Sequence, residues 1–201
     1  MKKIISLFQR NYDGDRLVRD EVVPGAEWVV AGEGQATRMF DGTCCMVRDG
    51  VLYKRYDAKQ GKKPPANFEP AQDYDEVTGH MPGWIPVGSG PEDKWHRQAL
   101  ENQPDLRDST YELCGPKVQG DAEREYRCKT WGVSEDMHIL IQHGCCLFAS
   151  ECDGVFRDCV PRTFSGLKEW LSDRDIEGIV WHHPDGRMVK IKKKDFGLHR
   201  V

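Results

Sequence analysis

Short apolar runs, each closed by a turn signal, constrain the fold of this chain more than any other feature. Two runs flank Arg48-Asp49-Gly50 and two flank His183-Pro184-Asp185-Gly186, and such turns between strand-like runs predict β-hairpins. Residues 164–171 instead have helical spacing, with Thr163 or Ser165 as the candidate N-cap. Many short strands with few helices predict an antiparallel α+β fold. The expected strands are 27–31, 43–47, 51–56, 110–114, 138–142, 178–182 and 187–192.

The segment 57–98 interrupts this pattern. It is polar and contains six prolines, which predicts a long irregular excursion of the kind that is usually functional or mobile. The chain has 201 residues and no internal repeat, so we expect a single domain over residues 1–201.

Charge and apolar content exclude several classes of function. The chain has 29 Lys and Arg against 33 Asp and Glu, a net charge of −4, so a uniformly basic nucleic-acid binder is excluded and any polyanion site must be a local patch. No apolar run approaches the ~20 residues that span a membrane, and the apolar stretch near the N-terminus is too short for a signal peptide. We therefore expect no membrane partner and a reducing, cytoplasmic compartment.

The eight cysteines form a poor disulfide framework, because two adjacent pairs and scattered singles lack regular spacing. We expect reduced thiols, mostly as small buried side chains. A zinc site built from His143, Cys145, Cys146 and Cys152 is the alternative, although structural zinc sites usually space their ligand pairs by two to four residues.

The last predicted hairpin carries a pair of lysines. Side chains two apart on a strand share a face, so Lys190 and Lys192 project together while Val189 and Ile191 point to the opposite, buried face. Glu177 lies where the partner strand begins. Two ammonium groups beside a carboxylate on a rigid sheet suit a phosphate and a metal ion. The alternative is a solvated cationic edge strand that discourages aggregation.

A second basic cluster follows the first predicted hairpin. Lys54, Lys59, Lys62 and Lys63 form a strip that is expected to contact the phosphates of RNA or DNA. The alternative interpretation is a charged surface loop without a partner.

Five short motifs, in order, resemble those of the covalent nucleotidyltransferases, which include DNA ligases, RNA ligases and capping enzymes. Those enzymes carry K-x-D-G, an arginine element, a strand with a functional Glu, an E-G-hydrophobic-hydrophobic strand and a K-x-K strand. The matching residues are Met39-Phe40-Asp41-Gly42, Arg55-Tyr56-Asp57, Tyr111-Glu112-Leu113, Glu177-Gly178-Ile179-Val180 and Lys190-Ile191-Lys192.

Longer stretches resemble, more closely, the ATP-dependent 5′-to-3′ RNA ligase family of vertebrate type. They are Asp41-Gly42-Thr43-Cys44-Cys45, the segment 79–87, Trp95-His96 and the segment 177–182, and the resemblance runs from about residue 36 to 199. It implies a nucleotidyltransferase domain of antiparallel sheets with flanking helices. Only nine residues follow Lys192, so no C-terminal oligonucleotide-binding-fold domain is expected; this argues against a DNA ligase or a capping enzyme.

The resemblance also implies roles for single residues. Lys190 and Lys192 hold the α-phosphate of ATP, and Arg38, Arg55, Glu112 and Glu177 complete the ATP site. Asp41, Glu112 and Glu177 hold Mg²⁺ or Mn²⁺, through water. Backbone groups near residues 36–38 and an apolar cover from Ile139, Ile141 or Phe148 are candidates for the adenine site. The expected partner is RNA with 5′-phosphate and 3′-hydroxyl ends.

One residue departs from the family pattern. The nucleophilic lysine belongs at position 39, where this chain has Met39. Methionine matches lysine in length but has no amine, so it forms no phosphoramide bond to AMP. We interpret the chain as an engineered, inactive form of an active RNA ligase, in which the nucleophile has been replaced but ATP and Mg²⁺ still bind. The alternatives are a natural pseudoenzyme that binds ATP or RNA ends, and a displaced nucleophile at Lys54.

Overall fold

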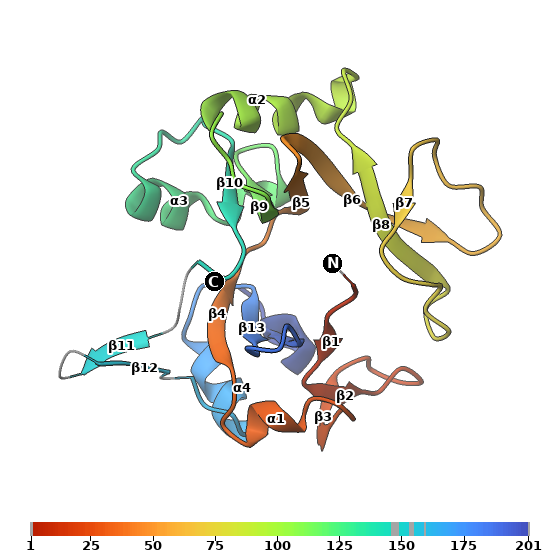
Figure 1. The fold of residues 1–201 in the computed structure, drawn as a ribbon. Helices are drawn as coiled ribbons and strands as arrows, with labels where there is room; N and C mark the ends of the chain where they lie inside the picture. Colours follow the sequence, from red (N-terminus) through yellow and green to blue (C-terminus); the bar gives the residue numbers. More distant parts are fainter. Residues whose placement is uncertain (1, 146–148, 153–154, 159, 201) are drawn as a thin grey trace. The chain divides into compact units, whose positions relative to one another are not determined.

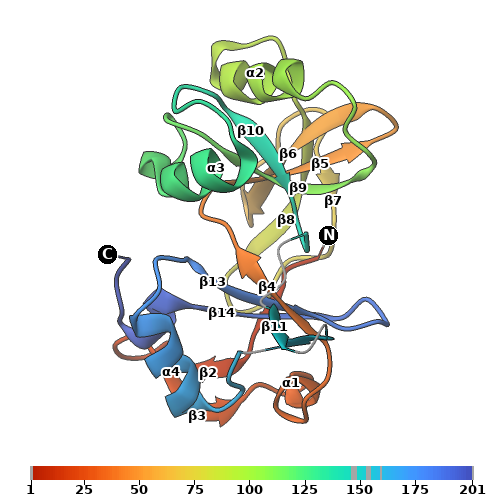
Figure 2. The same ribbon diagram turned by 90° about the vertical axis from the view of Figure 1, so that its left-hand side faces the viewer.

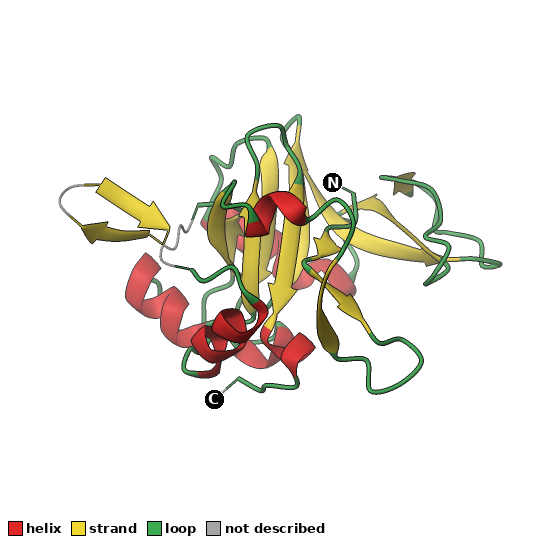
Figure 3. Cartoon of the chain, turned by 90° about the horizontal axis from the view of Figure 1, so that it is seen from below, coloured by secondary structure: helices red, strands yellow, loops and turns green. Residues whose placement is uncertain are grey.

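The structure is a computed structural model that describes residues 2–145, 149–152, 155–158 and 160–200. Its internal contacts divide the chain into two compact units. Unit 1 consists of Met1–Lys3 and Asp41–His143, and unit 2 of Ile4–Phe40 and Gly144–Val201. Both strands and helices are present (Figure 3), and nearly all strand pairs are antiparallel, which confirms the α+β prediction. That residues 1–201 form one domain stays a prediction.

Unit 2 is built on a four-stranded sheet. Its strand order is β1 (Ile5–Ser6), β14 (Met188–Lys192), β13 (Gly178–His182) and β4 (Gln35–Met39). Figure 1 labels β1, β13 and β4. One face packs on helix α4 (Phe164–Ser172), helix α1 (Glu27–Val30) and the hairpin of β2 (Phe8–Arg10) and β3 (Val18–Val22), all seen together in Figure 2. The core there includes Phe8, Leu167, Leu171, Ile179, Trp181, Val189 and Ile191.

Unit 1 is built on a six-stranded antiparallel sheet. Its order is β10 (Ile139–Gln142), β9 (Ser109–Cys114), β5 (Thr43–Arg48), β6 (Val51–Lys59), β8 (His80–Pro86) and β7 (Glu69–Pro70). Helix α2 (Lys94–Asn102) supplies Ala99 to the core on one face, together with Cys45, Val47, Leu52, Tyr111, Leu113 and Leu140. Helix α3 (Arg124–Trp131) also belongs to unit 1.

Smaller elements complete the described chain. They are the pair β11 (Ala149–Cys152) and β12 (Val155–Asp158) and the 3₁₀ turns Pro91–Asp93, Gln119–Asp121 and Lys193–Phe196.

Both predicted hairpins are confirmed. Strands β5 and β6 are joined by Asp49 and Gly50, whose φ angles of 52° and 73° are those of the two-residue turn that the Asp-Gly pair favours. Strands β13 and β14 pair across a turn that ends at Gly186, with φ of 90°. The strands near 110–114 and 138–142 and the helix after Thr163 are also confirmed, and the Thr163 side chain accepts a hydrogen bond from the Gly166 N–H at 3.3 Å.

The predicted strand at 27–31 is wrong, because Glu27–Val30 is a single helical turn. Trp28 and Val29 are neighbours in sequence, and both are buried in the core of unit 2. A strand would send adjacent side chains to opposite faces, whereas a helical turn lets both enter one core. The Glu27 carboxylate also accepts a hydrogen bond from the Gly25 N–H at 2.8 Å, which fixes the start of the turn.

The segment 57–98 is more regular than predicted. It contains β7, β8 and the first half of α2, and β8 pairs with β6 from Tyr53 opposite Pro86 to Lys59 opposite His80. Prolines are tolerated in this strand because β7, its neighbour on the other side, is only two residues long, so most of β8 is an edge.

Candidate active site

The predicted lysine pair lies on the polar face of the unit 2 sheet. Residues directly opposite each other in an antiparallel sheet share a face. In the register, Gly178 lies opposite both Met39 and Lys192, and Val180 lies opposite Lys190. Met39, Lys190 and Lys192 therefore point to the same side, while Val189 and Ile191 are buried on the other. Met39 and Lys192 lie two strands apart, a backbone separation of roughly 10 Å.

Two polar pairs organise this face. The Lys192 ammonium donates to the Glu177 carboxylate, and both side chains are largely buried. One row of residues away, the buried Thr37 hydroxyl donates to the Val180 carbonyl at 3.1 Å and lies 3.1 Å from His182 Nε2. Hydrogen bonds and an ion pair therefore fix side chains on this face of the sheet.

Gly178 is required by the close approach of two strands. A Cβ at this position would lie 2.2 Å from the Ile191 carbonyl oxygen and 2.9 Å from the Lys192 Cα. The glycine after Glu177 therefore keeps β13 and β14 paired where Lys192 emerges.

Arg38 takes the opposite direction from Met39. It lies across from the buried Ile179, and its guanidinium donates to the Asp175 carbonyl at 3.2 Å and stacks over the Phe40 ring at 5.8 Å. The structure thus gives Arg38 contacts on the other face of β4. Its predicted contact with ATP stays a prediction.

The sheet of unit 1 also has one apolar and one polar face. On the polar face, Glu112 of β9 lies opposite Ile141 of β10 and Cys44 of β5. Arg55 of β6 continues the row, since its neighbour Lys54 pairs with Cys45, and Arg55 lies opposite Trp84 of β8. The Arg55 guanidinium stacks over the Trp84 ring at 5.3 Å, which is a cation–π distance.

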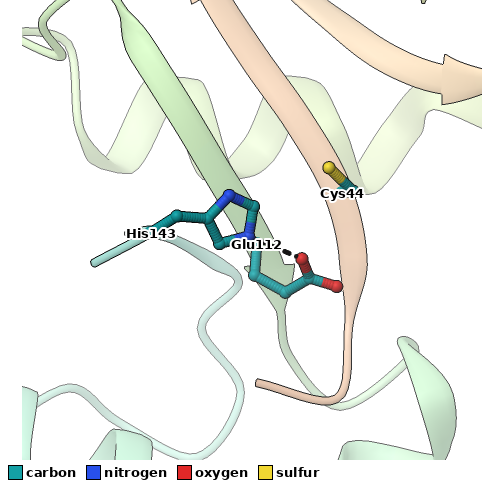
Figure 4. Close-up of side chains that lie close together, drawn as sticks. All are labelled: Cys44, Glu112 and His143. Carbon is teal, nitrogen blue, oxygen red and sulfur yellow. Dashed lines mark hydrogen bonds and ion pairs between the residues drawn. The ribbon is translucent and has the colours of Figure 1, made fainter. Parts of the chain in front are cut away.

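Glu112 is held by His143. The His143 Nε2 lies 2.9 Å from a Glu112 carboxylate oxygen, and the two side chains face each other in Figure 4. Cys44 lies on the neighbouring strand, and its sulfur, one Glu112 oxygen and one His143 nitrogen lie within 4.8 Å of one another. This is the one group of three metal-ligating side chains found among the described residues.

Asp41 and Gly42 enter the same sheet. The buried Glu123 carboxylate accepts a hydrogen bond from the Asp41 N–H at 3.1 Å. A Cβ on Gly42 would lie 2.3 Å from the Leu113 carbonyl oxygen and 2.8 Å from Glu112 Cγ. The Asp-Gly pair is therefore more than a turn, because its glycine lets the chain pass directly against the strand that carries Glu112.

The four predicted RNA-binding lysines differ in their surroundings. Lys54 points into the apolar side of the sheet, where its ammonium pairs with the carboxylate of Asp93, a residue only 2% exposed. Lys59, Lys62 and Lys63 are exposed. The structure gives Lys54 a structural partner, whereas the other three stand on the surface as an RNA contact requires.

Other predicted residues fall into three groups. Ile139 and Ile141 are buried beside Glu112 on the polar side of the sheet, whereas Phe148 lies outside the described residues. Cys45 and Cys114 are buried, and burial raises the pKa of both thiols well above the ordinary value. Cys145 is exposed, contrary to the expectation of buried thiols, and Cys146 and the side chain of Cys152 lie outside the described part of the chain.

Sequence reasoning missed the association of His143 with Glu112 and the stacking of Arg55 on Trp84. The available signal was the position of His143 at the end of a predicted strand, which places it beside whatever pairs with that strand. No helix in the described ranges has the length and apolar content needed to cross a membrane.

Comparison with known proteins identifies the family. The sequence model of the family RNA ligase 1 matches residues 99–200, about half of the chain, and this stretch includes Glu112, Glu177, Lys190 and Lys192. The chain is 24% identical to RNA ligase 1 of Pongo abelii and of Mus musculus and 25% identical to that of Danio rerio, over 81% of this chain and 67% of each relative. With the family motifs found in their expected order on two polar sheet faces, the chain belongs to the RNA ligase 1 family.

Proposed function

We propose that this chain has the scaffold of an ATP-dependent RNA ligase, which joins RNA 3′-hydroxyl and 5′-phosphate ends through lysyl-AMP and RNA-adenylate intermediates, and that Met39 occupies the position of its nucleophile. The observation that carries this proposal is the register of the unit 2 sheet. It sets Met39, Lys190 and Lys192 on one face, and Gly178 lies between Met39 and Lys192.

The lysines serve the phosphates. In each step of the proposed reaction a nucleophile displaces a leaving group at phosphorus, so positioning and neutralisation of charge dominate catalysis. Lys190 and Lys192 would contact the α-phosphate and stabilise its growing negative charge. Lys192 is paired with Glu177 in this structure, so the triphosphate would share or replace a partner that already fixes the ammonium in place.

The polar face of unit 1 serves the nucleoside. Glu112 offers a carboxylate to the ribose hydroxyls, and the largely buried Arg55 offers a guanidinium to the ribose or the phosphates. Ile141, in the same row as Glu112, supplies apolar surface for the adenine. A mixture of carboxylate, guanidinium and aliphatic surface suits a nucleoside better than it suits a bare polyphosphate.

The family resemblance assigns Mg²⁺ to the carboxylates of Asp41, Glu112 and Glu177, through water. Carboxylate oxygens are the donors that Mg²⁺ prefers, and an ion that keeps several of its waters tolerates carboxylates already engaged, as Glu112 is with His143 and Glu177 is with Lys192. Bound there, Mg²⁺ would neutralise charge on the phosphate oxygens. The same donors suit Mn²⁺.

Position 39 decides whether the first step occurs. In a lysine-bearing form, the amine nitrogen forms a bond to the α-phosphorus and loses a proton to water, the bond from that phosphorus to the bridging oxygen breaks, and pyrophosphate leaves. Met39 has a thioether in place of the amine and forms no such bond, so this chain is expected to bind ATP without becoming adenylylated.

The test is to restore the amine. The Met39→Lys variant, incubated with Mg²⁺ and ATP labelled in the α-phosphate, should acquire a covalent label on residue 39 and then seal 5′-phosphorylated RNA. Met188→Lys is the matched control, because Met188 lies on the same face of β14 but in the row of His182. A Met39→Lys variant that binds ATP yet stays unlabelled would contradict the proposal and favour a module that only binds ATP or RNA ends.

A further inference from the structure

Three potential metal ligands converge on the polar face of the unit 1 sheet. Cys44 and Glu112 are direct neighbours across β5 and β9. His143 follows β10, and its backbone N–H donates to the Thr110 carbonyl at 3.0 Å, which extends the β10–β9 pairing by one residue. Strand pairing therefore fixes the backbone of all three, and their convergence does not depend on a loop.

The chemistry of this set differs from that of a magnesium site. A thiol, an imidazole and a carboxylate are typical ligands of Zn²⁺ and similar borderline ions, whereas Mg²⁺ prefers oxygen alone. The donor atoms lie within 4.8 Å of one another, and His143 Nε2 is 2.9 Å from a Glu112 carboxylate oxygen. Ligands at the usual bond lengths of about 2.0–2.3 Å in a tetrahedral arrangement are separated by roughly 3.3–3.7 Å, so small side-chain movements would suffice.

The cluster is also accessible. The His143 side chain is 24% exposed and that of Glu112 is 12% exposed, and Cys44 is half-buried. Three protein ligands leave the fourth tetrahedral position for water or another ligand.

We propose that Cys44, Glu112 and His143 bind Zn²⁺ or a chemically similar divalent ion. We also propose that this ion engages the Glu112 carboxylate and so prevents it from contacting the nucleotide. The second half rests on the proposed function, which assigns Glu112 to ATP. A zinc ion on Glu112 would replace its contact with the ribose, so zinc and ATP would compete.

The binding step can be tested on the present chain without any activity. Titration with Co²⁺ under reducing conditions should give a thiolate-to-cobalt charge-transfer band that saturates at one ion per chain, and Zn²⁺ should displace it. Cys44→Ser should abolish the band. His143→Gln should weaken Zn²⁺ affinity by at least about 10- to 100-fold, since even loss of an outer-shell partner costs that much.

Cys128→Ser is the matched control, because Cys128 is a half-buried free thiol on α3, outside the cluster. It should bind both metals as the parent chain does, and circular dichroism should show that all variants fold. A cobalt band that survives Cys44→Ser, or the absence of any band in the parent chain, would overturn the proposed site.

The competitive step needs the Met39→Lys background. Micromolar Zn²⁺ at constant excess Mg²⁺ should raise the KM for ATP in self-adenylylation, and adding Cys44→Ser should reduce that inhibition at least tenfold. Equal inhibition with and without Cys44 would overturn the competition. Failure of Met39→Lys to react at all would count against the ligase function and leave the cobalt result standing.

Discussion

The sheets of the two units share a design but differ in the chemistry of their polar faces. Each packs one apolar face on a core and turns polar side chains to the other side. In unit 2 that face carries two lysines on the same side of the sheet as Met39. In unit 1 it carries Glu112 and Arg55 beside an isoleucine and a tryptophan.

In the proposed function, this contrast separates two tasks, which are catalysis at phosphorus and binding of the nucleoside. Cations act on charge that develops at phosphorus during the reaction, so their loss should slow the chemical step. A mixed polar and apolar face makes contacts that are similar before and during the reaction, so its loss should weaken binding. The division between the units predicts different kinetic signatures for substitutions in each.

The largest expected effect is in the lysine pair. In the Met39→Lys background, Lys192→Ala should lower the rate of self-adenylylation at saturating ATP by about 10²–10³-fold, the loss typical of one group that stabilises transition-state charge. Glu112→Gln should raise the KM for ATP with a smaller change in that rate. Lys194→Ala, at an exposed position just after β14, is the control and should leave both parameters unchanged. The comparison fails if Lys192→Ala and Glu112→Gln alter rate and KM in the same proportions.

The lysine face was predictable because its signals are local. Alternation within five residues sets Lys190 and Lys192 on one side of β14, and the Asp-Gly turns fix the pairing of their hairpins over a few residues. Placing Met39 in the same face needed the pairing of β4 with β13, and only the family resemblance pointed to it before the structure did.

The mixed face was less predictable because it depends on register between distant strands. Glu112 lies beside Cys44 only because β9 pairs with β5, and beside His143 only because β9 also pairs with β10. A shift of one residue in either pairing would turn these side chains to the other face, and no local pattern sets that register. The predicted strand at 27–31 was wrong for a related reason. Packing against the core decided between helix and strand for the four-residue segment Glu27–Val30.

An intermediate effect, on the free energy of unfolding, is expected for substitution of Lys54. Comparison with Lys62 tests whether Lys54 has a structural role that the exposed lysines lack. Lys54→Met leaves the carboxylate of the buried Asp93 without its cation, and breaking such a pair costs about 3 kcal/mol of unfolding free energy. Lys62→Ala should change stability by less than about 0.5 kcal/mol. Urea unfolding measures both. In RNA binding the order should reverse, with Lys62→Ala reducing affinity and its dependence on salt. Equal stability of the two variants would remove the structural assignment of Lys54.

The pH dependence of the Lys54 effect has a definite sign. Burial raises the pKa of Asp93, but the Lys54 ammonium and the Gly88 N–H lower it by more, so the folded value lies below the ordinary 3.8. The parent chain therefore keeps this stabilisation above about pH 4 and loses it as the pH falls through the folded pKa. In Lys54→Met the pKa of Asp93 should rise, so the difference between the two proteins should be greatest at neutral pH and shrink in acid.

The smallest expected effects concern one surface carboxylate in each unit. In unit 1, hydrogen bonds from the Lys3 ammonium and Thr78 lower the pKa of Asp75 to about 2. In unit 2, the backbone N–H of Arg187 and then its guanidinium lower the pKa of Asp185 to about 2. Both folded values lie below the unfolded value of about 3.8, so each group stabilises the fold above that pH, and the contribution is lost between about pH 4 and 2.

The two carboxylates should respond differently when their cations are removed. Lys3→Ala deletes the leading cause of the low pKa of Asp75, so that pKa should move most of the way back toward 3.8. Arg187→Ala keeps the backbone N–H that dominates at Asp185, so its pKa should rise only in part. Carbon NMR titration of the side-chain carboxyl groups measures both in each variant, and the untouched carboxylate serves as the internal control. A larger rise in the pKa of Asp185 than in that of Asp75 would contradict this. It would show that side-chain charge, and not the backbone of the β13–β14 turn, sets the low pKa of Asp185.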